Sequence, residues 1–597
     1  MPSRRRLNLF AFPTETNALF SMLILASITL ALFSGNVIRF YSGIEDPVAS
    51  VDITSQRFEI SYAFLSVTCL SGVAALGTLC LALVFYLRHP RQIRQHRNLQ
   101  SLTEKDQTVQ EHVKKLALQA GADVPTVEMP LHSLKGSDAQ AFGVGKGQII
   151  ALDGGLRVLR KTKPAIFDAL IRHELAHFAN ADIGRSYFSD ALWRSIRWLL
   201  VFPFLFALTA ILIEGFFQGI FERSQLELAI AAIPSVLGLF IQWGFVLTIT
   251  GMIWARLLRT REFYADWRAA LWGSQNGLQE VLQEEIEKAR SRARISLWKF
   301  HPDARERLDV LQHPDLLFKL SPTMLFLAGL LLSFIFAGLS FSFAAFIVFA
   351  QNVLTLRDAT SGIFYWVLTG IWWGGFVVLI LLVFGLTGWL VNGVLLPQIQ
   401  KQAIRDLLKK QSGWRPYIKL GIPALILATG IELGFFMTPF SQLAPNDMVW
   451  FLIELFIILP VLTCLAWWYL IYIKFVASRV SATQIGSYFS VWRGRFLRTA
   501  SAVWVFLFFM PGLLLSRFID LGFPYFLYFN LGWLIFTLLF SPLVFGATWA
   551  AMKFFFDNQS KRCPHCRNFT HHAAAAIEVC EHCGGVLGEW LFVPESS

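Results

Sequence analysis

Long, uninterrupted runs of apolar residues constrain this chain more than any other feature. A helix needs about 20 such residues to cross the hydrocarbon of a bilayer, where backbone groups cannot be left unpaired. Runs of this kind lie at approximately residues 18–39, 61–87, 196–216, 228–255, 321–350, 363–396, 418–438, 449–473, 499–515 and 523–552. Because only 15% of the 597 residues are charged, a purely soluble enzyme is excluded. We predict an α-helical polytopic membrane protein with about ten spans.

The positions of the basic residues predict the orientation of these spans. Lys and Arg gather on the cytoplasmic side of membrane helices, so loops rich in both are expected to face inward. Such residues follow spans two, six and eight, in the segments 88–97, 401–415 and 474–495. We therefore expect an integral protein of the cell (inner) membrane of a prokaryote, with both termini in the cytoplasm. The net charge of +12 then reflects inner loops, and no nucleic-acid partner is expected.

Two polar segments on the inner side, about 88–195 and 256–320, are too long to be loops. The first has a helical pattern followed by short β-rich runs bounded by Pro and Gly, and the second contains charged helices. Together they predict one α+β domain at residues 88–320, interrupted by spans three and four at about 196–255. The remaining divisions are two N-terminal spans at 1–87, a six-span region at 321–556 and a cytosolic tail at 557–597.

Residues 173–177 read His-Glu-Leu-Ala-His, inside a stretch with helical periodicity. On a helix, His173 and His177 share one face and can bind one zinc ion, while Glu174 lies beside the metal-bound water. Zinc lowers the pKa of that water and polarises a carbonyl, and Glu174 serves as general base. Since this short pattern also arises by chance, it needs a third ligand to define a catalytic centre.

The second polar segment offers that ligand in the run RTREFYADWRAA. Glu262 would complete a site of two histidines and one glutamate and leave the fourth position for water. Asp266, one helical turn further on, is suited to hold a ligand histidine by its other ring nitrogen. Taken alone, two acids four residues apart are more often a solvated helix face.

These residues resemble the membrane-embedded zinc metallopeptidases that include HtpX and the CAAX prenyl proteases. The resemblance covers roughly residues 60–315 and implies a gluzincin fold, with HExxH on one helix, ExxxD on another and spans between them. It also implies supporting positions for Asn180 and Asp182 after the motif. His301 and Arg307 match the family's HP-to-Arg element, which implies catalytic support of the oxyanion or substrate. A helix-capping His-Pro followed by a surface arginine is the open alternative.

The same family carries an Asn-Ala-Phe-Ala-like run before the strand that receives substrate. This chain has a partial match, DAQAFG at residues 138–143. We expect a substrate edge that involves Ala141, Phe142 and Ile149, with strand 147–152 as the edge that docks an extended peptide. Docking through backbone hydrogen bonds gives affinity with little sequence preference.

The tail contains two CxxC pairs, Cys563 with Cys566 and Cys580 with Cys583. Four thiolates on two tight turns enclose one ion and leave no open position, so we predict a small zinc ribbon with a structural zinc. A disulfide framework is disfavoured on the reducing, cytosolic side. The chain would thus hold two Zn²⁺, one catalytic and one structural.

The leading hypothesis is a zinc metalloendopeptidase that cleaves polypeptides, chiefly membrane proteins, at a cytoplasm-facing site, in quality control or processing. One alternative is a CAAX-type prenyl-protein protease. The other is a non-catalytic membrane scaffold or receptor whose zinc sites are structural and whose ribbon recruits a cytosolic partner. An intact HExxH motif together with Glu262 favours the enzyme, because an enzyme that has lost its activity usually loses the base first.

Overall fold

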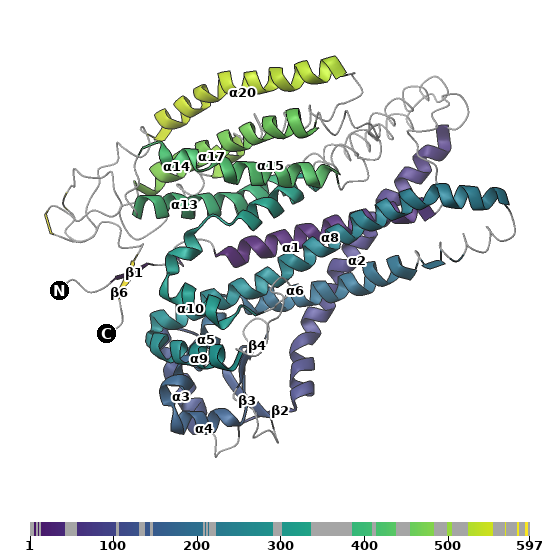
Figure 1. The fold of residues 1–597 in the computed structure, drawn as a ribbon. Helices are drawn as coiled ribbons and strands as arrows, with labels where there is room; N and C mark the ends of the chain where they lie inside the picture. Colours follow the sequence, from purple (N-terminus) through teal and green to yellow (C-terminus); the bar gives the residue numbers. More distant parts are fainter. Residues whose placement is uncertain are drawn as a thin grey trace, which may run out of the picture.

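The computed structural model (Figure 1) describes fourteen stretches of the chain and a few single positions between them. The stretches are residues 5–7, 14–41, 57–102, 107–130, 138–143, 147–206, 223–289, 301–335, 385–408, 413–436, 454–482, 498–503, 523–552 and 592–594. Of the predicted ribbon cysteines, Cys583 alone falls among the described positions. The ribbon itself lies outside them.

Two helices, α2 (Arg57–Arg97) and α8 (Arg223–Ala269), are longer than a bilayer requires. Their 41 and 47 residues correspond to about 60 and 70 Å at 1.5 Å per residue, against about 30 Å of hydrocarbon. Each therefore continues beyond its apolar part into the polar domain without a break. The end of α2 holds the sheet through two ion pairs, Arg94 with Glu128 at 2.7 Å and Arg97 with Asp153 at 2.8 Å.

The polar domain is built on a four-stranded sheet in the order β2-β3-β5-β4. The strands are β2 (Leu99–Ser101), β3 (Thr126–Pro130), β4 (Ala139–Phe142) and β5 (Ile149–Leu152). β5 runs parallel to β3 and antiparallel to β4, so β4 forms one edge of the sheet. The sheet packs against α3 (Gln107–Ala120) and α5 (Pro164–Ala179) over a core of fully or nearly fully buried side chains that includes Val113, Ile150, Phe167 and Leu175.

The remaining helices of this domain are α4 (Gly155–Thr162), α6 (Ile183–Ile196), the turn η3 (Arg197–Val201), η4 (Ala270–Ser274), α9 (Gln275–Ala289), α10 (Ala304–Gln312) and η6 (Pro314–Phe318). Of these, α4, η4 and α9 pack against α5. α9 approaches α5 closely at Gly277, where an added Cβ would lie 2.6 Å from the Ala165 carbonyl oxygen. Chain segments before and after α8 thus pack against the same helix, and the division into domains stays a prediction.

The C-terminal part is helical and lies along α1 (Glu15–Tyr41) on the side away from the sheet (Figure 1). Its elements are η7 (Val391–Leu395), α13 (Leu396–Leu408), α14 (Arg415–Ile418), α15 (Gly421–Phe436), η9 (Glu454–Ile458), α17 (Leu459–Ala482) and α20 (Phe523–Met552). A large apolar core joins α1, α6 and α8 to these helices. The two chain ends pair as antiparallel strands, β1 (Arg5–Leu7) with β6 (Phe592–Pro594).

Among the described residues, six helices are long and apolar enough to cross a membrane. They fall on the second, fourth, fifth, seventh, eighth and tenth of the predicted spans, at Val73–Arg97, Phe240–Glu287, Leu316–Ile335, Arg415–Phe435, Phe456–Ser478 and Ile535–Met552. The first predicted span contains a shorter apolar helix, Glu15–Ala31. The sixth and ninth lie largely outside the described residues, and the third is described continuously only over residues 196–206. The helices indicate a membrane protein, and the total of ten spans stays a prediction.

Candidate metal centre

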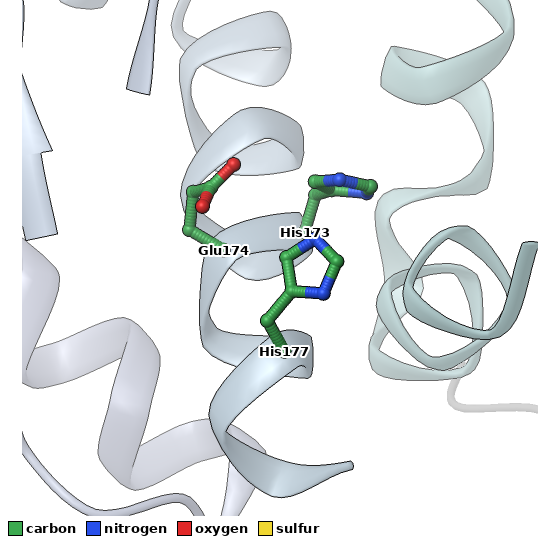
Figure 2. A group of neighbouring side chains, drawn as sticks. All are labelled: His173, Glu174 and His177. Carbon is green, nitrogen blue, oxygen red and sulfur yellow. The ribbon is translucent and has the colours of Figure 1, made fainter. Parts of the chain in front are cut away.

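Helix α5 presents the two histidines of the HExxH pattern one turn apart. Pro164 at its first turn fits a helix start, and the buried faces toward the sheet and α8 fix its rotation. The rings of His173 and His177 lie 4.9 Å apart and nearly perpendicular, on the same side of the helix (Figure 2). Ligand atoms of both rings and of Glu174 lie within 4.8 Å of one another. The motif is therefore assembled as its spacing predicts.

Glu262, on α8, reaches both rings from the facing helix. Its Oε2 lies 3.3 Å from His173 Nε2, and its Oε1 lies 3.8 Å from His177 Nε2. Zinc bonds of about 2.0–2.1 Å in tetrahedral geometry place two ligand atoms about 3.3 Å apart. The two Nε2 atoms and the Glu262 carboxylate thus have the chemistry and the spacing that a zinc ion needs, and all three side chains are at most 8% exposed.

The other nitrogen of each ring faces a buried carboxylate. His173 Nδ1 lies 2.8 Å from Asp266, and His177 Nδ1 lies 3.0 Å from Asp182. A carboxylate at Nδ1 holds the proton there and directs Nε2 toward the metal. The structure therefore places Asp266 and Asp182 where they orient the two rings.

A left-handed residue makes the contact with Asp182 possible. Ala181 has φ +53°, an uncommon conformation for a residue with a Cβ, and it reverses the chain between α5 and α6. The Asp182 N–H then donates to the His177 carbonyl oxygen at 3.3 Å, which returns the carboxylate to the ring five residues earlier. Asn180 lies at the same turn, and its Oδ1 accepts from Arg268 Nε at 2.5 Å, which ties the end of α5 to α8.

Two arginines neutralise the carboxylates of the centre. Arg307, from α10, donates from Nε and Nη2 to the two oxygens of Asp266, both at 2.7 Å. Arg261 donates from Nε to Glu262 Oε1 at 2.9 Å. Both contacts stabilise a buried negative charge, so Arg307 acts on the histidine His173 through Asp266.

These charges change the acid–base behaviour of the site. Burial alone would disfavour the charged His173 ring, but Asp266 and Glu262 outweigh it and raise its pKa to about 10. Burial raises the pKa of Glu174, against the lowering influence of His177, His173 and the Ala141 N–H. A carboxylate with a raised pKa is a better proton acceptor at neutral pH than an ordinary glutamate.

The predicted docking edge is corrected by the strand order. Strand 147–152 is not an edge, because β5 pairs with β3 on one side and with β4 on the other. Its continuous IIAL run is fully buried, as is typical of an interior strand. The edge is β4, which contains Ala141 and Phe142, whereas Ile149 pairs with Phe142 from inside the sheet.

The edge strand contacts the candidate base directly. The Ala141 N–H donates to Glu174 Oε2 at 2.6 Å, and the Tyr187 hydroxyl donates to the Ala141 carbonyl at 2.8 Å. Both backbone groups of Ala141 therefore face away from β5. Because alternate residues of an antiparallel strand point the same way, Ala139 also faces this side.

His301 has an electrostatic partner outside the group of zinc-ligand side chains. Its imidazole is exposed, just before α10, and interacts electrostatically with Asp138, the residue that precedes β4. His301 is thus near the start of the edge strand, while Arg307 is held on Asp266. The two residues, paired in the sequence-based prediction, occupy different places.

The sequence reasoning did not include Arg261 or Tyr187. Arg261 directly precedes Glu262, and a cation beside a buried acid is a signal that the run RTREF contains. Tyr187 has no such signal, because its contact with Ala141 joins residues 46 positions apart.

The fold and this site define a membrane-associated protein with a metallopeptidase-type centre. Residues 103–315 match the model of the family described as Peptidase family M48, which includes relatives of HtpX and the CAAX proteases. The matched segment contains α5, Glu262 and Arg307. Neither a curated protein nor a solved structure matches the chain.

Proposed function

We propose that this chain is an integral membrane zinc endopeptidase that hydrolyses peptide bonds of membrane proteins at a cytoplasm-facing site. The observation that carries the proposal is the convergence of His173 Nε2, His177 Nε2 and the Glu262 carboxylate, with Glu174 beside them. A non-catalytic scaffold would use His173, His177 and Glu262 to hold a structural zinc, but it has no use for Glu174.

The residues divide the reaction between them. Zinc, when bound, supplies a Lewis acid that acidifies a water molecule and polarises a carbonyl. Glu174 accepts a proton at its carboxylate and returns it to the leaving amine. The β4 edge binds the substrate backbone as an added strand, which requires Glu174 and Tyr187 to release Ala141 where the strand covers it. This exchange would free the base when substrate arrives.

The place of the site supports membrane proteins as substrates. Glu262 lies seven residues beyond the predicted end of span four at residue 255, on the same unbroken helix α8. That separation is about 10 Å, so the centre would lie just below the hydrocarbon, within reach of segments next to a membrane anchor. The cytoplasmic side is inferred from the basic loops.

The tail carries a second zinc in this proposal. Cys563, Cys566, Cys580 and Cys583 would hold a structural ion in a zinc ribbon that is available to a cytosolic partner.

The test is hydrolysis of an unstructured polypeptide by the purified protein in lipid vesicles. We expect cleavage by the wild type, its loss on chelation, and its recovery with added zinc. Glu262→Ala should lose both the catalytic zinc and cleavage. Cleavage that survives chelation, or that Glu262→Ala retains, would contradict the proposal. Cleavage restricted to a farnesylated peptide would indicate the prenyl-protease alternative.

A further inference from the structure

Helix α8, which carries Glu262 and Asp266, is packed both on the face that meets α5 and on the opposite face. Glu262 and Asp266, four residues apart, share the face that meets α5. Tyr264 is two residues from each, so it projects from the opposite face, where it is 1% exposed. Whatever contacts Tyr264 therefore supports the part of the helix that carries both carboxylates.

Two elements from distant parts of the chain meet at the Tyr264 hydroxyl. Lys401, on α13, donates from Nζ at 2.9 Å, and the Glu15 N–H at the start of α1 donates at 3.3 Å. Lys401 is 2% exposed, so its ammonium has been removed from water. Burying an ammonium group is costly unless it is hydrogen-bonded, which makes this contact specific rather than incidental.

The same face of α13 enters the core of the peptidase domain. Ile404 is 1% exposed and belongs to the apolar cluster that contains Ala169 of α5 and Tyr264 and Trp267 of α8. Lys401 and Ile404 are three residues apart and lie on one side of their helix. A helix from outside residues 103–315 thus completes the packing between the two helices that carry the candidate zinc ligands.

The far side of α13 is fastened to the C-terminal helices. Lys474 of α17 pairs with Asp406 of α13 at 2.5 Å and donates to the Pro416 carbonyl at 2.9 Å. Both Lys474 and Asp406 are largely buried. Through α13, the C-terminal helices are therefore connected to the back of the zinc helix by polar contacts on both sides.

We propose that α13 is a positioning element of the metal centre. Lys401, through Tyr264, together with Ile404 keeps Glu262 and Asp266 at their places opposite α5. The proposal rests on the proposed function and assigns a task to the region that follows the peptidase domain. Lys401 and Tyr264 are positioning residues, since neither reaches a ligand atom.

The test compares Lys401→Met, Tyr264→Phe and the double variant with the wild type in the full-length protein. Methionine keeps the apolar stem of Lys401 and removes the ammonium, so this variant leaves no buried charge without a partner. Lys419→Met, an exposed lysine after α14, is the matched control. We measure the rate at which a chelator removes zinc, together with kcat and KM for a model polypeptide.

We expect about 10-fold faster removal of zinc and a similarly lower kcat in each single variant, the lower end of the effect of contacts behind metal ligands. KM should be unchanged in all three variants. The unfolding midpoint should be unchanged in Lys401→Met and in the double variant, whereas Tyr264→Phe should lower it, because the buried Lys401 ammonium loses this acceptor. The double variant should be no worse than the single ones, because both remove one contact. Lys419→Met should behave as the wild type.

Zinc retention and kcat equal to the wild type in an active Lys401→Met protein would overturn the inference and leave the proposed function intact. In Lys401→Met or the double variant, loss of kcat only in parallel with a lower unfolding midpoint would also overturn it, because the role would then be structural. An inactive wild type would instead overturn the proposed function. The rate of zinc removal would still show whether the contact between Lys401 and Tyr264 stabilises the metal centre.

Discussion

Arg307 and Asp266 form a two-point ion pair behind the His173 ring, with both N–O distances at 2.7 Å. The guanidinium therefore acts on the centre through a carboxylate that holds a ligand. Arg307→Gln should leave Asp266 buried without its cation, and we expect zinc affinity to fall by about 10- to 100-fold. Competition with a chromophoric chelator measures this. Arg307→Lys, with one donor point, should recover part of the loss. Unchanged zinc affinity with reduced kcat would instead favour direct contact with substrate.

Tyr187 fixes the substrate edge through its hydrogen bond to Ala141. Tyr187→Phe removes a hydrogen bond of about 1 kcal/mol that the docking strand has to displace from Ala141, so we expect KM to fall about 5-fold with a smaller effect on kcat. Steady-state kinetics on a long polypeptide separates the two parameters. Tyr86→Phe, which removes a hydroxyl from a ring that packs on Phe188, serves as the control. A fall in kcat alone would show that Tyr187 acts on the chemistry rather than on docking.

The sequence predicts contacts within one helix better than contacts between distant helices. Histidine and carboxylate positions within one helix follow from a period of 3.6, so His173, Glu174 and His177 could be placed together without a structure. Arg307 was identified from a resemblance, but its partner Asp266 lies 41 positions away, and no spacing rule gives that contact.

The order of the strands could not be predicted from the sequence either, because it depends on pairing between distant positions. A short apolar run such as IIAL fits an edge or an interior strand, and the choice depends on the pairing of β5 with both β3 and β4. The support of Tyr264 by Lys401 spans 137 positions and joins two regions that composition treats as separate. Long apolar helices, by contrast, are marked by composition alone, and six of them are confirmed in the described residues.

Zinc binding should weaken as the pH falls. The pKa of His173 in the metal-free protein is raised to about 10, so the ring carries a proton throughout the neutral range. Zinc must displace that proton, and its affinity should rise on the order of 10-fold per pH unit between about pH 6 and 8. Titrations at several pH values measure this, with Glu262→Ala reporting the ribbon alone. An affinity for the catalytic site that is independent of pH would contradict the charge network described here.

The turn at Ala181 stores a small conformational cost. At φ +53° a Cβ costs about 1 kcal/mol, and glycine avoids it. Ala181→Gly should therefore keep the unfolding midpoint or raise it slightly, with the contact between Asp182 and His177 preserved and zinc content unchanged. Thermal unfolding and metal analysis test this together. Marked destabilisation would mean that the residue does not adopt a left-handed conformation.

The two zinc sites should be separable. We expect two zinc ions per chain in the wild type and one in Cys580→Ser, which removes a ribbon thiolate and leaves His173, His177 and Glu262 in place. Metal analysis counts the ions, and hydrolysis by Cys580→Ser reports whether the catalytic centre stays intact. A single zinc ion in the wild type that Cys580→Ser retains would contradict the predicted zinc ribbon.

The central claim is that Glu174 is the base of a zinc-dependent hydrolysis. The most direct measurement determines zinc content and peptide-bond cleavage on the same preparations of the wild type and Glu174→Gln. We predict equal zinc in both proteins and a rate of cleavage lower by about 10²- to 10⁴-fold in the variant, because the ligands remain and the proton acceptor is gone. Equal cleavage by the two proteins, at equal zinc content, would contradict the claim.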